Sequence, residues 1–234
     1  MFFKSRCRPR SLPMDAHELS QRWQGLMAAL PPSARLLAVS KGHPAAAIRD
    51  LAALGQVAFG ESRVQEALRK QEELADLTQL QWHFIGRLQA NKVRQVLRAF
   101  GTIHSLDSLA LCERVSRIAG EERCQPRVML QVKLRPDPNK GGWDPEALRQ
   151  VWPDLQRLPH CSIVGLMTIA PLGLAPEERL ALFRDCRQLA DDLGLSECSM
   201  GMSGDWAEAV SAGATWVRLG SALFGERSVQ QSVA

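Results

Sequence analysis

A lysine, two segments rich in glycine and serine, and one arginine stand out because each follows or ends a short apolar run. Lys41 comes directly after the apolar run at 36–40 (LLAVS). A lysine at the end of a buried strand is partly withdrawn from water, which lowers its pKa and favours the free amine that attacks an aldehyde. Position alone favours the plainer interpretation, a solvated surface lysine.

The segments 199–205 (SMGMSGD) and 218–221 (RLGS) have the composition of anion-binding turns. Turns of this kind that open onto helices present backbone N–H groups to an anion. Ser203 and Ser221 add hydroxyl donors. Either segment alone could be an ordinary turn or cap, but the two together predict a phosphate site that includes Gly220.

Arg218 lies inside the apolar run 215–220 (TWVRLG), where a charge is costly unless it has a partner. One interpretation is a structural ion pair with an acid such as Glu61 or Asp205. The other places the guanidinium against a ring nitrogen of a ligand. A permanent cation there would keep that nitrogen unprotonated and weaken the ring as an electron sink.

Polar residues follow several other apolar runs, and capping or turn formation explains each of them individually. Of these, Glu61, Ser62 and Thr168 could line a shared pocket. The others are Arg87, Gln89, Asn91, Lys92, Asn139 and Lys140.

The elements that must position these residues form a regular alternation of apolar runs with amphipathic helical stretches. Eight strands are expected, at 36–40, 56–60, 83–86, 102–106, 128–134, 162–167, 198–200 and 215–220. Helices are expected at 15–29, 44–54, 62–75, 90–99, 108–119, 145–157, 175–193 and 205–212. Apolar strands joined by crossover helices indicate a buried parallel sheet. The count predicts an α/β fold of the (β/α)8 TIM-barrel type, with an open doubly wound sheet as the alternative.

Composition fits one globular domain over residues 14–234, with 45% hydrophobic and 23% charged residues. No apolar run approaches the length of about 20 residues that crosses a bilayer. The net charge of +4 is carried by four basic residues in the acid-free segment 1–13. We therefore expect a short disordered tail, no membrane association and no nucleic-acid partner.

The six cysteines contain no CxxC pair, which favours reduced thiols and a cytoplasmic location. The five histidines show no metal-ligand spacing, so no metal is expected.

Several of these segments together closely resemble the pyridoxal phosphate homeostasis protein family, over about residues 15–227. The matching segments are AVSKG (38–42), FGESRVQE (59–66), WHFIGRLQANK (82–92), DPNKGG (137–142), GLMTI (165–169), SMGMSGD (199–205) and VRLGSALFG (217–225). The resemblance implies a barrel like that of alanine racemase. It also implies pyridoxal 5′-phosphate (PLP) held as a Schiff base on Lys41, with the phosphate on Ser203, Gly220 and Ser221. Arg218 would face the pyridine nitrogen.

The chain departs from the family pattern at four positions near this site. Ser62 and Arg63 replace the usual Asn-Tyr, which shortens or removes a polar contact to the ring. Ser221 replaces a threonine and keeps the hydroxyl, and Gly42 replaces another threonine with a consequence that the sequence does not define.

The resemblance implies a non-catalytic, monomeric carrier of PLP that could serve PLP-dependent apo-enzymes and indirectly affect amino-acid and keto-acid pools. A racemase of the same fold is the alternative. That reaction needs a second base, which in the related racemase is a tyrosine supplied with a C-terminal domain, and this chain has 0 Tyr. A Schiff-base aldolase is a third possibility, but its lysine usually lies on a later strand with acids nearby.

Overall fold

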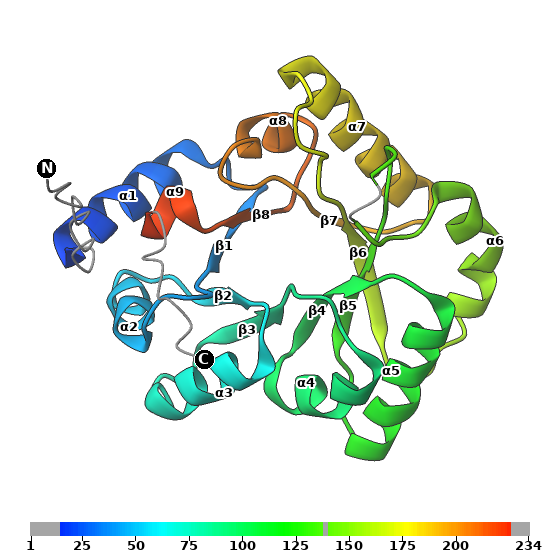
Figure 1. Ribbon diagram of the computed structural model, residues 1–234, viewed down its shortest axis with the longest axis horizontal. Coiled ribbons are helices and arrows are strands. Elements are labelled where there is room, and N and C mark those ends of the chain that lie inside the picture. The colour runs from blue at the N-terminus through cyan, green and yellow to red at the C-terminus, as the bar shows by residue number, and fades with distance from the viewer. Residues whose placement is uncertain (1–14, 138–139, 226–234) are drawn as a thin grey trace, which may run out of the picture.

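Eight parallel strands form a closed barrel in the computed structural model, which describes residues 15–137 and 140–225. The strands follow one another around the barrel in chain order, and β8 pairs with β1 to close it. Figure 1 shows the ring of strands at the centre with helices around it. The predicted (β/α)8 barrel is confirmed, and the open sheet is excluded.

The element bounds are close to those expected from the apolar pattern. The strands are β1 (Arg35–Val39), β2 (Ala58–Glu61), β3 (Gln81–Phe84), β4 (Thr102–Leu106), β5 (Arg127–Gln131), β6 (Ser162–Met167), β7 (Glu197–Ser199) and β8 (Trp216–Leu219). The helices are α1 (Ala16–Ala29), α2 (Ala45–Ala53), α3 (Val64–Glu73), α4 (Val93–Ala99), α5 (Leu109–Glu122), α6 (Pro145–Leu155), α7 (Pro176–Asp192), α8 (Trp206–Ser211) and α9 (Ser221–Phe224), with a short 3-10 turn η1 (Ala90–Lys92) before α4.

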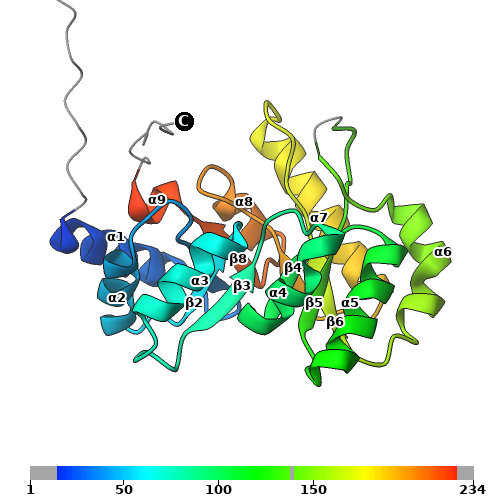
Figure 2. The same cartoon turned by 60° about the horizontal axis from the view of Figure 1, so that its bottom comes forward.

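The strands are apolar on both faces because each is covered on both sides. In β1, Leu36 and Ala38 belong to the large cluster between the barrel and its helices. Leu37 between them packs inside the barrel with Met129 and Met167. Seen obliquely in Figure 2, helices α3 to α6 lie outside strands β2 to β6. All strands run the same way, so their carboxyl ends, where such barrels carry chemistry, share one face.

The fifth strand ends earlier than the sequence suggests, at Gln131 instead of residue 134. Beyond it, Val132 forms a bridge with Trp143 in the following loop. The Trp143 N–H donates to the carbonyl of Gln131 at 2.7 Å, and the Lys133 N–H donates to the carbonyl of Trp143 at 2.9 Å. The apolar residues after 131 therefore pair with the chain as it returns toward α6, which a strand pattern does not anticipate.

No helix in the described part of the chain is long and apolar enough to cross a membrane. The five cysteines in this part are free thiols, and four of them are buried. The segment 1–13 and Asn139 lie outside the described residues.

Candidate functional site at the carboxyl ends of the strands

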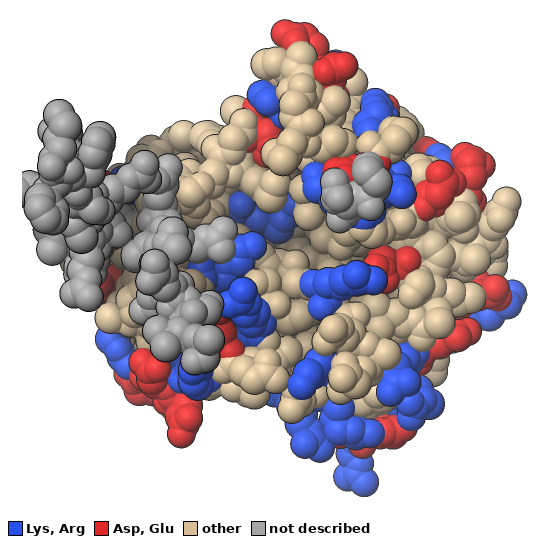
Figure 3. Space-filling model, viewed as in Figure 1, with Lys and Arg blue, Asp and Glu red and all other residues tan. Residues whose placement is uncertain are grey.

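The predicted site residues lie at or just beyond the carboxyl ends of five strands, with Ser203 in the loop after β7. Lys41 is the second residue after β1, Ser62 directly follows β2, and Thr168 directly follows β6. Arg218 is the penultimate residue of β8, which leads into Gly220 and Ser221. Figure 3 looks onto the barrel in the direction of Figure 1 and shows Lys and Arg side chains gathered near the centre of this face.

A buried charged cluster holds the residues on either side of Lys41. The Lys70 ammonium, on α3, lies 2.7 Å from Oε1 of Glu61 and 2.8 Å from Oε1 of Glu66, and donates to the carbonyl of Ser40 at 2.8 Å. The Ser40 hydroxyl donates to Glu61 at 2.7 Å, and the Gly42 N–H donates to Glu66 at 2.5 Å. The half-buried Lys41 thus extends from a backbone that is fixed on both sides.

Glu61 is the central carboxylate of this cluster and is fully buried. Its Oε2 has no hydrogen-bond partner in the described structure. Burial raises the pKa of Glu61, and the Lys70 ammonium partly opposes this rise. The sequence interpretation considered Glu61 as a lining residue or as a partner of Arg218, and missed its pairing with Lys70. The two residues are nine positions apart on a strand and a helix, a spacing that belongs to no recognisable pattern.

Arg218 is 5% exposed and is held by oxygen atoms of two neighbouring strand ends. One terminal nitrogen donates to the carbonyl of Ser199 at 2.6 Å and to its hydroxyl at 2.9 Å, and the other donates to the carbonyl of Thr168 at 2.8 Å. These oxygens, and not an acid, hold the guanidinium: among the described residues neither Glu61 nor Asp205 forms an ion pair with it. No described residue accepts a hydrogen bond from its Nε. Burial lowers the pKa of Arg218 to about 10, so it remains charged at neutral pH.

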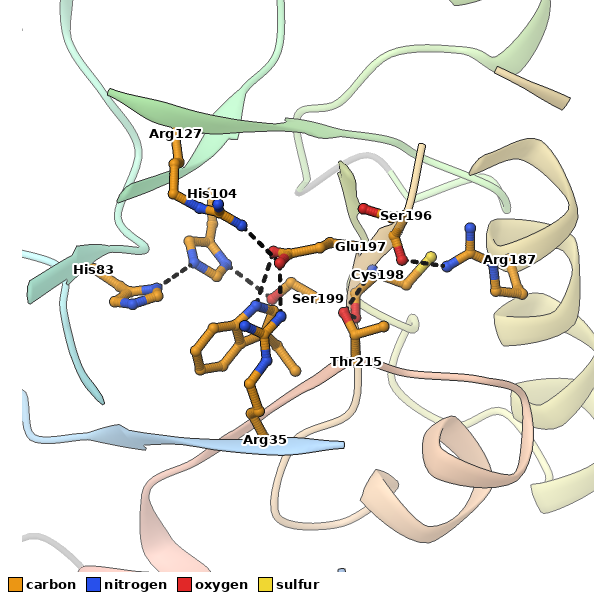
Figure 4. A network of polar contacts seen from close by, with 11 residues as sticks. Arg35, His83, His104, Arg127, Arg187, Ser196, Glu197, Cys198, Ser199 and Thr215 are labelled. Atoms are coloured by element: carbon orange, nitrogen blue, oxygen red, sulfur yellow. Dashed lines mark hydrogen bonds and ion pairs between the residues drawn. The ribbon is translucent and has the colours of Figure 1, made fainter. Parts of the chain in front are cut away.

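A chain of buried polar groups runs from Arg218 into the barrel. Nδ1 of His104 lies 2.9 Å from Oγ of Ser199, and Nε2 of His104 lies 2.9 Å from Nδ1 of His83 (Figure 4). Burial lowers the pKa of His83 to about 4 and that of His104 well below its ordinary value, so both rings are neutral. Sequence reasoning did not single out these histidines, because they lie on predicted strands without metal-ligand spacing.

The loops after β7 and β8 are joined directly. The Ala222 N–H donates to the Ser203 hydroxyl at 3.1 Å, so Ser203 lies against the start of α9. Gly220 packs against β1, since a Cβ added to it would lie 3.5 Å from the carbonyl of Val39. The loop after β8 is therefore next to the strand that carries Lys41. No described residue accepts a hydrogen bond from the backbone N–H groups of Ser203, Gly204 or Ser221.

The two remaining predicted residues have different surroundings. The Thr168 hydroxyl donates to the carbonyl of Val132 at 3.0 Å and so has a structural partner, while its own carbonyl binds Arg218. Ser62 lines a separate hollow of about 290 Å³ with Arg87 and Lys92, on the β2–β3 side of the barrel face. No hydrogen bond links Ser62 to Arg218 or Thr168 among the described residues.

This arrangement can hold an elongated anion with a ring. The joined loops offer N–H groups and the exposed Ser221 hydroxyl at one end. Arg218 offers a fixed charged donor beside them, and Lys41 projects from the adjacent strand. These groups suit a phosphorylated heteroaromatic aldehyde such as PLP. In the described residues no three His, Cys, Asp or Glu side chains are placed to hold a metal ion.

Three comparisons relate the chain to known proteins. Residues 14–228 match the family described as "Alanine racemase, N-terminal domain". The "Pyridoxal phosphate homeostasis protein" of Synechocystis sp. is 49% identical over 208 residues, which cover 86% of this chain and 95% of that protein.

Two solved structures of PipY from Synechococcus elongatus are also similar. The form without PLP has a TM-score of 0.87 and 54% identity, and the form described as having PLP bound has a TM-score of 0.85 and 53% identity. Each comparison covers 88% of this chain and 100% of the other. The chain therefore belongs to the family of the alanine racemase N-terminal domain, and within it to the pyridoxal phosphate homeostasis proteins.

Proposed function

We propose that this protein binds PLP at the carboxyl end of its barrel, with a covalent, reversible link to Lys41, and stores and exchanges it without catalysing a reaction. The observation that carries the proposal is the closure of the barrel between β1 and β8. Leu37 pairs with Arg218 and Ala38 with Leu219, which brings the lysine of the first strand beside the arginine and phosphate loop of the last. The similarity to PipY, which is described with PLP bound, supports the same ligand here.

Each site residue then has a defined part. PLP supplies an aldehyde that an amine can capture reversibly. Ser203, Gly220 and Ser221 bind its phosphate, and Arg218 donates from Nε to its ring nitrogen. Thr168 acts mainly through the carbonyl that fixes Arg218, and Ser62, whose side chain lines the neighbouring hollow, borders the pocket at the end of β2.

The environment of Arg218 supports storage over catalysis. A guanidinium that stays charged can only donate a hydrogen bond, so the ring nitrogen facing it accepts one and remains unprotonated. An unprotonated ring stabilises a carbanion poorly. We further propose that the protein acts as a monomer in the cytoplasm, supplies PLP-dependent apo-enzymes, and through them affects amino-acid and keto-acid pools. The names of the similar homeostasis proteins agree with this role.

The test is spectroscopic. The full chain, incubated with PLP and freed of excess, should show a visible absorption band that borohydride removes, and mass spectrometry should then find the reduced adduct on Lys41. Lys41→Ala should abolish both. Lys92→Ala, which removes a lysine from η1 beyond β3 on the same face, is the matched control and should retain both. An undiminished adduct in Lys41→Ala would disprove the assignment of the lysine.

The non-catalytic role has a separate readout. PLP-loaded protein should racemise L-alanine no faster than free PLP at the same concentration. Turnover clearly above that level, lost in Lys41→Ala, would replace the storage role with an enzymatic one.

A further inference from the structure

A large hollow lies at the opposite end of the barrel from Lys41. It has a volume of about 560 Å³, and its wall includes the first residues of four strands: Arg35, Gln81, Thr102 and Arg127. Pockets for small organic ligands commonly have volumes of about 300–1,000 Å³. The space is therefore large enough for a small molecule, on the face where barrels of this type do not usually carry their site.

Two arginines at this hollow share a single carboxylate. Arg35 and Arg127 each donate to Oε1 of Glu197 at 2.7 Å, and they approach it from opposite sides in Figure 4. The Trp216 indole N–H donates to Oε2 of Glu197 at 3.0 Å. Two guanidinium groups and one carboxylate leave an excess of one positive charge. About half of each arginine side chain is exposed, 48% for Arg35 and 51% for Arg127, so each guanidinium can donate further hydrogen bonds.

His83 adds a buried donor to the same wall. The residue is 3% exposed and lines the hollow, and no described residue bonds to its Nε2. The direction of the polar chain behind it indicates where its proton lies. Arg218 can only donate, so the Ser199 hydroxyl accepts from it and its own proton is directed to Nδ1 of His104.

The positions of the protons on His104 and His83 follow from this hydrogen bond. A neutral His104 that accepts at Nδ1 carries its proton on Nε2 and donates it to Nδ1 of His83. His83 then carries its proton on Nε2, where it is available to the hollow. The opposite direction would leave the buried Ser199 hydroxyl proton without an acceptor, which is costly.

We propose that this hollow is a second binding site, for a small organic monocarboxylate with a flat apolar body. The excess of one positive charge matches a monoanion, and the planar fork of arginine matches a carboxylate. The half-buried Trp82 ring, which also lines the hollow, provides apolar surface for the body of the ligand. The buried Trp216 ring is covered on one face by the Arg35 guanidinium, whose Cζ lies 3.9 Å from the ring centroid.

A purely structural role explains only part of this arrangement. Closing the end of the barrel around Glu197 requires one arginine, and the charge of the second is left over. The ion pairs also give no reason for a hollow of this size, or for a buried imidazole donor in its wall without an acceptor.

The test uses benzoate as the probe and the indole N–H signal of Trp216 in ¹⁵N-labelled full-length protein as the reporter. Benzoate should shift this signal in a saturable way. Arg127→Met keeps the aliphatic part of the side chain and leaves Arg35 and Trp216 on Glu197, and should weaken binding at least about fivefold. Arg94→Met, which removes an arginine paired with acids of α5, is the matched control and should leave the affinity unchanged.

Gly101→Phe provides a blocking variant. Gly101 lines the hollow, and a Cβ added to it meets no atom within 4 Å, so a larger side chain can start from this position without a clash. This variant should lose benzoate binding while keeping the wild-type melting temperature. The proposal is overturned if benzoate does not shift the signal in the wild type, or if Gly101→Phe binds it equally well. Tighter binding of inorganic phosphate than of benzoate would overturn the ligand class.

Discussion

The neutral state of His83 makes the stability of the barrel depend on pH. Burial lowers the pKa of His83 from 6.5 to about 4, so in acid the unfolded chain takes up a proton before the native protein does. Stability is therefore complete above pH 6.5 and falls as the pH decreases toward 4. A shift of this size corresponds to about 3 kcal/mol in full, of which about 2 kcal/mol is lost by pH 5.

The variant His83→Asn isolates this contribution. The asparagine side-chain oxygen can take the place of Nδ1 and accept the hydrogen bond from His104, but asparagine does not titrate. Chemical unfolding at pH 7.5 and 5.0 should show about 2 kcal/mol less loss of stability in the variant than in the wild type. Glu61 has the opposite effect on stability in acid, because its raised pKa makes the native state take up a proton first. This effect is the same in both proteins, so it cancels in the difference between their losses of stability.

His17→Asn, on the exposed side of α1, is the matched control and should lose as much stability as the wild type. If the wild type and His83→Asn lose the same free energy between these two pH values, His83 is not a buried neutral group and the direction assigned to the polar chain is wrong.

Two further predictions concern stability. Lys70→Met leaves the buried carboxylate of Glu61 without its ammonium partner. Urea unfolding should show a loss of about 3–5 kcal/mol in the free energy of unfolding, because a broken buried ion pair leaves an uncompensated charge. A loss below about 1 kcal/mol would mean that the ion pair is dispensable. Gly86→Ala should destabilise the protein, since its Cβ would lie 2.3 Å from the carbonyl oxygen of Ser62. Gly25→Ala, inside α1 with nothing within 4 Å of the new Cβ, should instead gain about 0.5–1 kcal/mol; equal melting temperatures for the two variants would contradict the packing at Gly86.

The barrel could be predicted from sequence because its strands are buried on both sides. Runs such as 36–39 (LLAV) are apolar without alternation, and the structure places β1 at Arg35–Val39. The end of a strand was harder to predict where the following loop pairs with the sheet, as it does after Gln131. The pattern of apolar residues records burial, and Val132 is as buried in its bridge with Trp143 as it would be in a strand.

The places of the candidate site residues in the fold could be predicted where position in the chain alone determines them. Lys41, Gly220 and Arg218 follow or end apolar strands, so a barrel brings them to one face. Their partners could not be predicted, because these depend on the distances between elements. Arg218 illustrates this: a buried cation suggests an acid, yet carbonyl oxygens of the neighbouring strand ends hold it.

Lys70 is a second residue whose surroundings could not be predicted from the sequence. It lies in a highly charged helix, where a lysine is expected to face water, and yet it is 6% exposed beneath the loop of Lys41. The histidine chain was also missed, since a search for metal ligands does not detect rings that bond to each other.

The seam between β1 and β8 has a consequence for the synthesis of the protein. Lys41 leaves the ribosome early, whereas Arg218 and the loop after it are among the last described residues to be made. Until β8 has emerged and paired with β1, the nascent chain has the reactive lysine but neither the cation nor the loop beside it. Non-local closure of this kind is slow compared with helix formation. If these residues hold PLP as we propose, an interrupted translation product would be unable to retain it, and capture would begin only once the barrel is complete.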